Sequence, residues 1–164
     1  MTERNALGLD LGTKMGFALQ TGKRLDTGAW NFTTRPHAAP GQRFADFYAK
    51  LDSIQAQTGG LVAVFYEQVR FSKFATATRI WGGFEAVLLT WCARRHVHVF
   101  GIETAPLKLF ATGNGHAKKE EMIRMFQMLS GAKGTDDNEA DAYHVLQWGL
   151  HKAKREGLTC QQSK

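Results

Sequence analysis

Cysteine is scarce in this sequence, and long apolar runs are missing. The two cysteines, Cys92 and Cys160, are far apart and have no cysteine neighbours, which excludes a zinc ribbon and a disulfide framework. No stretch reaches the ~20 apolar residues of a membrane-spanning helix, and residues 1–5 form no apolar signal core. We therefore expect a protein of the reducing cytoplasm that has no membrane partner.

Acidic residues are outnumbered by basic ones. The 164 residues include 21 Lys and Arg against 15 Asp and Glu, giving a net charge of +6, which favours a polyanionic partner such as nucleic acid over a membrane. Basic composition alone does not separate a nuclease from other small basic proteins. The length supports one domain, because each enzyme domain usually needs at least ~100 residues. We assign residues 1–154 to this domain and residues 155–164 to a basic polar tail.

Hydrophobic patterning predicts three strands followed by alternating helices and strands. The first three strands are separated by turns, which indicates an antiparallel meander, whereas 61–66 is continuously apolar, as in a central strand covered on both faces. The predicted strands cover 6–11, 16–20, 28–33, 61–66 and 96–101, and the predicted helices cover 44–54, 74–95, 118–129 and 139–154, with another helix beginning near Pro106. This order predicts an α/β domain with a mixed five-stranded sheet flanked by helices.

Carboxylates lie where two of these strands end. Asp10 ends the first strand and Glu67 ends the apolar fourth one, so both emerge at the same sheet edge if the strands are neighbours. A third acidic group opens the last helix, where Asp137 and Asp141 are four residues apart and share a helix face. Three acidic points that are distant in the chain are therefore expected to converge.

Converging carboxylates call for divalent cations, because their mutual repulsion makes the ionised forms costly to hold near a core. Oxygen ligands without cysteine suit Mg²⁺ or Mn²⁺, and two such ions about 3.5–4 Å apart can activate water and stabilise the leaving oxygen in phosphodiester cleavage. Each carboxylate also has a simpler interpretation. Asp10 can make a turn, Glu67 can pair with Arg70, and the acids near Asp137 can cap a helix.

Four segments resemble the RuvC-type Holliday junction resolvases, in the same order along the chain. They are 7–18 (LGLDLGTKMGFA), 66–69 (YEQV), 111–120 (ATGNGHAKKE) and 137–142 (DNEADA). The third segment is the most specific, and the fourth contains the family's closing Asp-Ala pair. The glycine and aliphatic residues of 83–89 match part of the family's long helix, so the resemblance covers about residues 7 to 150.

This resemblance implies an RNase H-like fold and a metal-dependent endonuclease that cleaves branched DNA. It implies that Asp10, Glu67 and Asp141 bind two Mg²⁺ or Mn²⁺ ions and that Lys118 or Lys119 lies near the scissile phosphate; of the two we assign Lys118 to catalysis. The implied partners are a four-way DNA junction and a second copy of the chain, with no nucleotide cofactor. The residues expected to contact DNA are Lys14, Arg70, Phe71, Lys73, Arg79, Asn114, Lys118 and Lys119.

The chain departs from the family pattern at two places. Bacterial members usually have an Asp three residues before the closing Asp; this chain has Asn138 there, and the nearest acids are Asp137 and Glu139. We assign the fourth ligand to Asp137, one helical turn before the closing Asp. The family's aromatic residue after Glu-Gln-Val is also displaced, since Arg70 stands there and Phe71 follows. The compact chain and these differences indicate a phage or prophage member.

The helix over 74–95 and His144 each allow two interpretations. Gly82 and Gly83 would allow close approach of a second copy, which predicts a two-fold dimer through this helix, and packing within one core is the alternative. The apolar residues of this predicted interface are Trp81, Phe84, Leu88 and Trp91. His144 follows Asp141 by one turn and could shuttle a proton or be a structural residue.

Three other functions share parts of the pattern. Residues 10–13 also resemble the phosphate loop of actin-like ATPases and sugar kinases, but those enzymes close two such domains around a nucleotide, which 164 residues cannot supply. An RNase H-like nuclease of the type that processes pre-16S ribosomal RNA would cleave RNA instead of junction DNA. A non-catalytic DNA-binding module would keep the lysines and bind DNA without cutting it in Mg²⁺.

Overall fold

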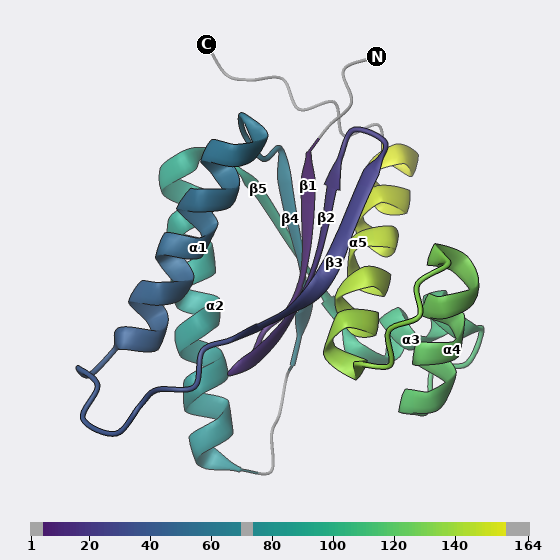
Figure 1. Ribbon diagram of the computed structural model, residues 1–164. Coiled ribbons are helices and arrows are strands. Elements are labelled where there is room, and N and C mark those ends of the chain that lie inside the picture. Colours follow the sequence, from purple (N-terminus) through teal and green to yellow (C-terminus); the bar gives the residue numbers. More distant parts are fainter. Residues whose placement is uncertain (1–4, 70–73, 157–164) are drawn as a thin grey trace.

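A computed structural model describes residues 5–69 and 74–156 of the chain (Figure 1). The elements are β1 (Ala6–Asp10), β2 (Lys14–Thr21), β3 (Arg24–Asn31), α1 (Gln42–Thr58), β4 (Ala63–Gln68), α2 (Ala75–Arg95), β5 (His98–Glu103), α3 (Thr104–Thr112), α4 (Lys119–Ser130) and α5 (Asp137–Arg155). None of the described helices has the length and apolarity needed to cross a membrane. From residue 157 onward, the predicted basic tail lies outside the described residues.

The predicted mixed five-stranded sheet is confirmed, with the strand order β3-β2-β1-β4-β5. The first three strands pair in antiparallel fashion, and β4 and β5 run parallel to β1. The predicted third strand, 28–33, started too late, because a tight turn at Gly22, with φ of 60°, already pairs Thr21 with Arg24. Because β3 is a half-exposed edge strand, its first residues are polar, and the apolar pattern in the sequence did not reveal where the strand starts.

Two hydrophobic cores lie on opposite faces of the sheet. Successive side chains of a strand alternate between the faces, so Leu7 and Leu9 of β1 join the core under α1 and α2, while Ala6 joins the core under α5. In β4, Val64 packs on the α1 and α2 side and Phe65 on the α5 side. This two-sided burial confirms the interpretation of 61–66 as a covered central strand, and Figure 1 shows the two layers of helices.

Glycines allow α5 to lie very close to the sheet. A Cβ atom at Gly16 would be 1.8 Å from the backbone oxygen of Asn138, and one at Gly8 would be 2.5 Å from the backbone oxygen of Ala142. Any side chain at either position would therefore push the helix away from β1 and β2. This contact brings the first turns of α5 beside the carboxyl end of β1.

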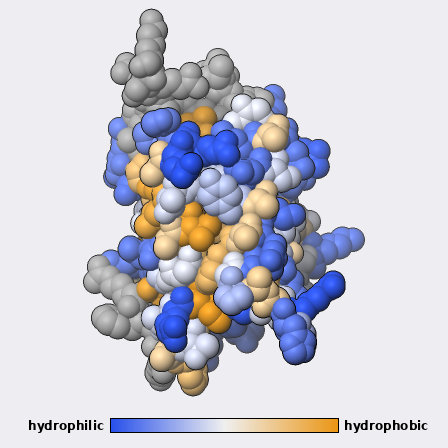
Figure 2. Space-filling model, turned by 90° about the vertical axis from the view of Figure 1, so that its left-hand side faces the viewer, coloured by the Kyte–Doolittle hydropathy of each residue, from blue (hydrophilic) through white to orange (hydrophobic). Residues whose placement is uncertain are grey.

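The apolar stripe of α2 serves the core and not an interface, so that part of the dimer prediction is wrong. Phe84, Leu88 and Trp91 are fully buried against the sheet and α1. Gly83 packs against α1, since a Cβ atom there would lie 2.4 Å from the Phe44 ring. The outer face of α2 is different, because it is exposed. Figure 2 shows that apolar residues gather in a band on the side of the molecule that carries α1 and α2. The exposed small and apolar residues of the outer face of α2 are Ala86, Leu89 and Ala93.

Candidate active site

Asp10 and Glu67 lie side by side at the carboxyl ends of the neighbouring strands β1 and β4. Leu9 of β1 pairs with Tyr66 of the parallel strand β4, so the next residues on the two strands are Asp10 and Glu67. Because Leu9 and Tyr66 face the core under α1 and α2, the alternation of side chains directs both acids toward α5. The sheet register therefore places two carboxylates on the same face.

Helix α5 adds two carboxylates to this pair. Asp137 is its first residue and Asp141 lies one turn later on the same face. Both acids lie close enough to Asp10 to raise its pKa, and Glu67 acts on Asp10 and on Asp141 in the same way. The structure thus brings together the four carboxylates that we expected to converge.

The cluster is short of positive charge. Burial, followed by repulsion from the other three acids, raises the pKa of Asp10 well above its usual range. Burial is also the largest cause for Asp141, whose pKa is raised to about 7, and for Glu67, whose pKa is raised although it is only 8% exposed and hydrogen-bonded. Carboxyl groups in such surroundings retain protons readily unless cations neutralise them.

Lys119 and Lys108 are the lysines whose charge acts on Asp10, Glu67 and Asp141. The ammonium of Lys119 forms an ion pair with Asp137 and lowers the pKa of Asp10 and Asp141. Lys108, on α3, lowers the pKa of Glu67 and Asp141. The Thr104 hydroxyl donates a hydrogen bond of 2.5 Å to Oε1 of Glu67.

Sequence reasoning missed Lys108 and Thr104. A usable signal was present, because both lie on the helix that directly follows β5, the parallel neighbour of the strand carrying Glu67, and they are four residues apart. Lys118, which we assigned to catalysis, is exposed at the start of α4, where its backbone N–H donates to Oε2 of Glu121 at 2.8 Å. Its proximity to a scissile phosphate stays a prediction.

The helix-cap interpretation applies to Asp136. Its Oδ1 atom accepts hydrogen bonds from the backbone N–H groups of Asn138 and Glu139, at 2.9 and 3.2 Å. Its other oxygen lies 2.5 Å from the ammonium of Lys14, which we expected to contact DNA. This lysine therefore links the start of β2 to the start of α5.

Neither alternative for the fourth ligand faces the cluster. The side-chain amide of Asn138 lies 3.3 Å from Oδ1 of Asp136, and Oε1 of Glu139 accepts a hydrogen bond of 2.6 Å from the Thr27 hydroxyl. Among these neighbouring positions, Asp137 is the one whose charge acts on Asp10. Of the three residues, Asp137 is the one beside the cluster, and its role as the fourth ligand stays a prediction.

His144 has a structural role in this fold. It is 1% exposed, and its Nε2 atom lies 2.9 Å from the backbone oxygen of Met122 on α4. Burial lowers its pKa, which keeps the ring neutral. Its hydrogen bond joins α5 to α4, so the structural interpretation explains its position.

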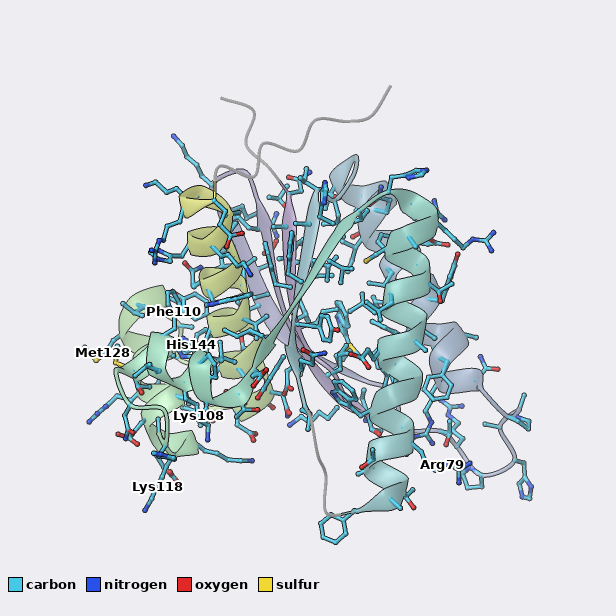
Figure 3. All side chains as sticks on the ribbon, turned by 180° about the vertical axis from the view of Figure 1, so that it is seen from behind. Arg79, Lys108, Phe110, Lys118, Met128 and His144 are labelled. Atoms are coloured by element: carbon cyan, nitrogen blue, oxygen red, sulfur yellow. The ribbon has the colours of Figure 1, made fainter. Side chains whose placement is uncertain are left out.

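The expected DNA contacts lie on several elements around the site. Arg79 is exposed on α2, and Asn114 is exposed in the α3–α4 turn, where its Oδ1 accepts from the backbone N–H of His116 at 3.0 Å. Figure 3 shows Lys108 and Lys118 on one side of the sheet and Arg79 on the other, toward the same end of the molecule. The remaining predicted contacts, Arg70, Phe71 and Lys73, lie outside the described residues.

The donor set fits hard divalent cations. Within residues 5–69 and 74–156, no three His, Cys, Asp or Glu side chains form a group that could hold one ion. Mg²⁺, however, usually keeps several waters and is bound by one or two carboxylates together with substrate phosphates. Four neighbouring carboxylates are oxygen ligands of the kind that such cations prefer. Asp10 is central, since each of the other three acts on it.

The sheet order, the helices on both faces and the acids at the ends of β1 and β4 define an RNase H-like fold. No protein-family model matches the sequence. A relative from Anaeromyxobacter dehalogenans named "Crossover junction endodeoxyribonuclease RuvC" is 30% identical over 152 residues, which cover 91% of this chain and 80% of the relative. A relative of the same name from Anaeromyxobacter sp. strain Fw109-5 is 30% identical over 159 residues, with 93% and 74% covered.

Solved structures share the fold. RuvC from Thermus thermophilus in complex with a Holliday junction substrate superposes with a TM-score of 0.78 at 21% identity, covering 93% of this chain and 96% of that one. The yeast mitochondrial Holliday junction resolvase gives 0.65 at 12% identity, covering 95% and 82%. The chain belongs to the RuvC family of crossover junction endodeoxyribonucleases. The predicted family and RNase H-like fold are confirmed.

Proposed function

We propose that this protein is a metal-dependent endonuclease that resolves four-way DNA junctions. The observation that carries the proposal is the convergence of Asp10, Glu67 and Asp141, with Asp137 beside them, at the carboxyl ends of β1 and β4. Membership of the RuvC family supplies the substrate class, because curated relatives are named for cleavage of crossover junctions.

The chain's own residues supply two kinds of contact with DNA. Lys108 and Lys119 present positive charge beside the carboxylates, where they can hold the phosphates on either side of the cleaved bond. Asp10, Glu67, Asp141 and Asp137 would hold the cations. When bound, two Mg²⁺ or Mn²⁺ ions would supply water activation and stabilisation of the leaving oxygen. The exposed Lys118 and Arg79 extend the basic surface that follows the DNA backbone.

A two-fold dimer completes the proposal, because one carboxylate cluster per chain serves one strand and resolution needs two symmetric cuts. The outer face of α2 is the surface we assign to it. A Cβ atom at Gly82 would have no neighbour within 4 Å, and Ala86, Leu89 and Ala93 are exposed beside it. Such a face permits close approach of a second helix without disturbing the core beneath.

A charge on this face tests the dimer. Leu89 is 40% exposed, so Leu89→Glu should leave the fold intact and give a monomer in light scattering that nicks junctions without making paired cuts. Leu109→Glu, on α3, is the matched control, because Leu109 is 57% exposed and lies on the other side of the sheet. A Leu89→Glu protein that stays dimeric would refute the assigned surface.

One cleavage experiment tests the activity. Purified protein is incubated in Mg²⁺ with a four-way junction, a matched duplex and a structured RNA, beside the Asp10→Asn variant. We expect paired cuts in the junction by the wild type alone, while Asp10→Asn still binds the junction because the basic surface is unchanged. Cleavage of RNA only, or junction binding without any cleavage, would refute junction resolution.

A further inference from the structure

Lys119 connects the carboxylate cluster to a second helix. It is the first residue of α4, and its ammonium pairs with Oδ2 of Asp137, the first residue of α5. The lysine side chain is 75% exposed and the Asp137 side chain is 34% exposed, so the pair lies at the mouth of the site. The two helix ends meet at this pair.

The Lys119 charge reaches beyond its direct partner. It lowers the pKa of Asp10 and of Asp141, and those two acids together with Asp137 raise the pKa of Lys119 in return. The ammonium therefore acts on three of the four carboxylates, while Lys108 acts on Glu67 and Asp141. No other described lysine or arginine is among the charges that act on Asp10.

The pair with Lys119 also engages an oxygen that a cation would need. Asp137 and Asp141 share a helix face, yet the described acids do not form a group of three around one point. A lysine ammonium has one positive charge, whereas a divalent cation has two and accepts several oxygen ligands. A divalent ion at this position is consequently a stronger partner for the cluster than the lysine.

We propose that Lys119 is the resident counterion of the carboxylate cluster, and that divalent cations must displace it from Asp137 in order to bind. The inference rests on the proposed function, because it takes the cluster to be a cation site. Once displaced, the ammonium remains beside the site, where a DNA phosphate can accept its hydrogen bonds. DNA that draws Lys119 away should therefore strengthen cation binding, and cations should strengthen DNA binding by the same factor.

The test measures cation binding without DNA and without cleavage. Free Mn²⁺ is followed by electron paramagnetic resonance during titration of the wild type, Lys119→Gln and Lys118→Gln. Both variants remove one charge at adjacent exposed positions, so their comparison separates a specific pair from the general loss of positive charge. Ion pairs between exposed and half-exposed side chains contribute little energy. We therefore expect Lys119→Gln to bind Mn²⁺ about three- to tenfold more tightly than the wild type, and the Mn²⁺ affinity of Lys118→Gln to change by less than about twofold.

A conservative variant provides the second measurement. Lys119→Arg keeps the charge and should bind Mn²⁺ like the wild type, whereas a purely structural role of the lysine would make both Lys119 variants bind more weakly. Equal Mn²⁺ affinity of Lys119→Gln and Lys118→Gln would overturn the counterion role and leave the proposed function standing. Absence of Mn²⁺ binding in all the proteins, folded by circular dichroism, would overturn the proposed metal-dependent function and the counterion role together.

Discussion

Replacing Asp141 by Asn should stabilise the cation-free protein while it abolishes cleavage. The Asn side chain has nearly the same shape, but it carries no charge into a site where burial and the neighbouring acids Glu67 and Asp137 oppose the ionised form. Stability and activity should therefore change in opposite directions. Such opposition is characteristic of a residue selected for chemistry rather than for folding.

The magnitude follows from the pKa of Asp141, which the fold raises from 3.8 to about 7. Below pH 4 the carboxyl is protonated in both folded and unfolded chains, so it costs nothing. As the pH rises from 4 to 7, the unfolded chain releases the proton and the folded chain retains it, so the wild type loses stability. At 1.36 kcal/mol per pKa unit the full cost above pH 7 is at most about 4 kcal/mol, and partial exposure of the side chain reduces it to between about 1 and 4 kcal/mol.

Thermal unfolding in EDTA measures this difference. For a chain of this length we expect Asp141→Asn to raise Tm by roughly 3 to 12 °C at pH 8 and by almost nothing at pH 4. Saturating Mg²⁺ should then raise the Tm of the wild type more than that of the variant, because the variant has lost a cation ligand. Asp46→Asn is the control, since Asp46 is exposed on α1, on the other side of the sheet.

Two results would refute this reasoning. If Asp141→Asn has the same Tm as the wild type in EDTA at pH 8, Asp141 is not held in a charge-deficient cluster. If the gain in Tm is equally large at pH 4 and pH 8, it comes from packing or helix propensity and not from the carboxyl charge.

Three further changes test the architecture of the site. Gly16→Ala should lower the unfolding free energy by about 1–3 kcal/mol in denaturant melts, because its Cβ atom would meet the Asn138 backbone at 1.8 Å, and it should lower the rate of cleavage as well. The control Gly115→Ala should change neither quantity, because its Cβ atom would meet nothing closer than 3.5 Å. His144→Asn should lower Tm through loss of its buried hydrogen bond to α4, while the pH profile of kcat keeps its shape. Loss of the acidic limb of that profile would restore the proton-shuttle role. Arg79→Ala should weaken junction binding and flatten its dependence on log salt by ~1 unit, with kcat unchanged, and an unaltered salt slope would remove it from the DNA surface.

Most of the fold could be predicted from the sequence because local patterns and global topology agree. The continuous apolar run before Glu67 identified a central strand, and the two-faced burial of Val64 and Phe65 explains why that run does not alternate. The start of β3 could not be predicted in the same way. An edge strand buries only part of each residue, so Arg24 and Asp26 give no apolar signal, and only the pairing across Gly22 defines them as strand.

In the candidate site too, some residues could be predicted from local sequence patterns and others could not. Carboxylates at strand ends were visible because strand ends are visible, and Asp137 followed from its spacing to Asp141. The contributions of Lys108 and Lys119 depend on how α3 and α4 dock beside α5, and no local pattern encodes that docking. The prediction of a dimer interface on the apolar stripe of α2 was wrong for a different reason. Its stripe is real, but Trp91 and its neighbours face the protein's own core, and a stripe in the sequence does not reveal which partner covers it.

The close contact between α5 and the sheet has a consequence for synthesis of the protein. The contact joins Gly8 and Gly16 to residues near position 140. The core on that face of the sheet therefore cannot form until α5, the last described helix, has been synthesised. A nascent or truncated polypeptide that stops before Asp137 contains Asp10 and Glu67 but neither acid of α5. Because α5 supplies both Asp137 and Asp141, such an unfinished polypeptide has no complete carboxylate cluster.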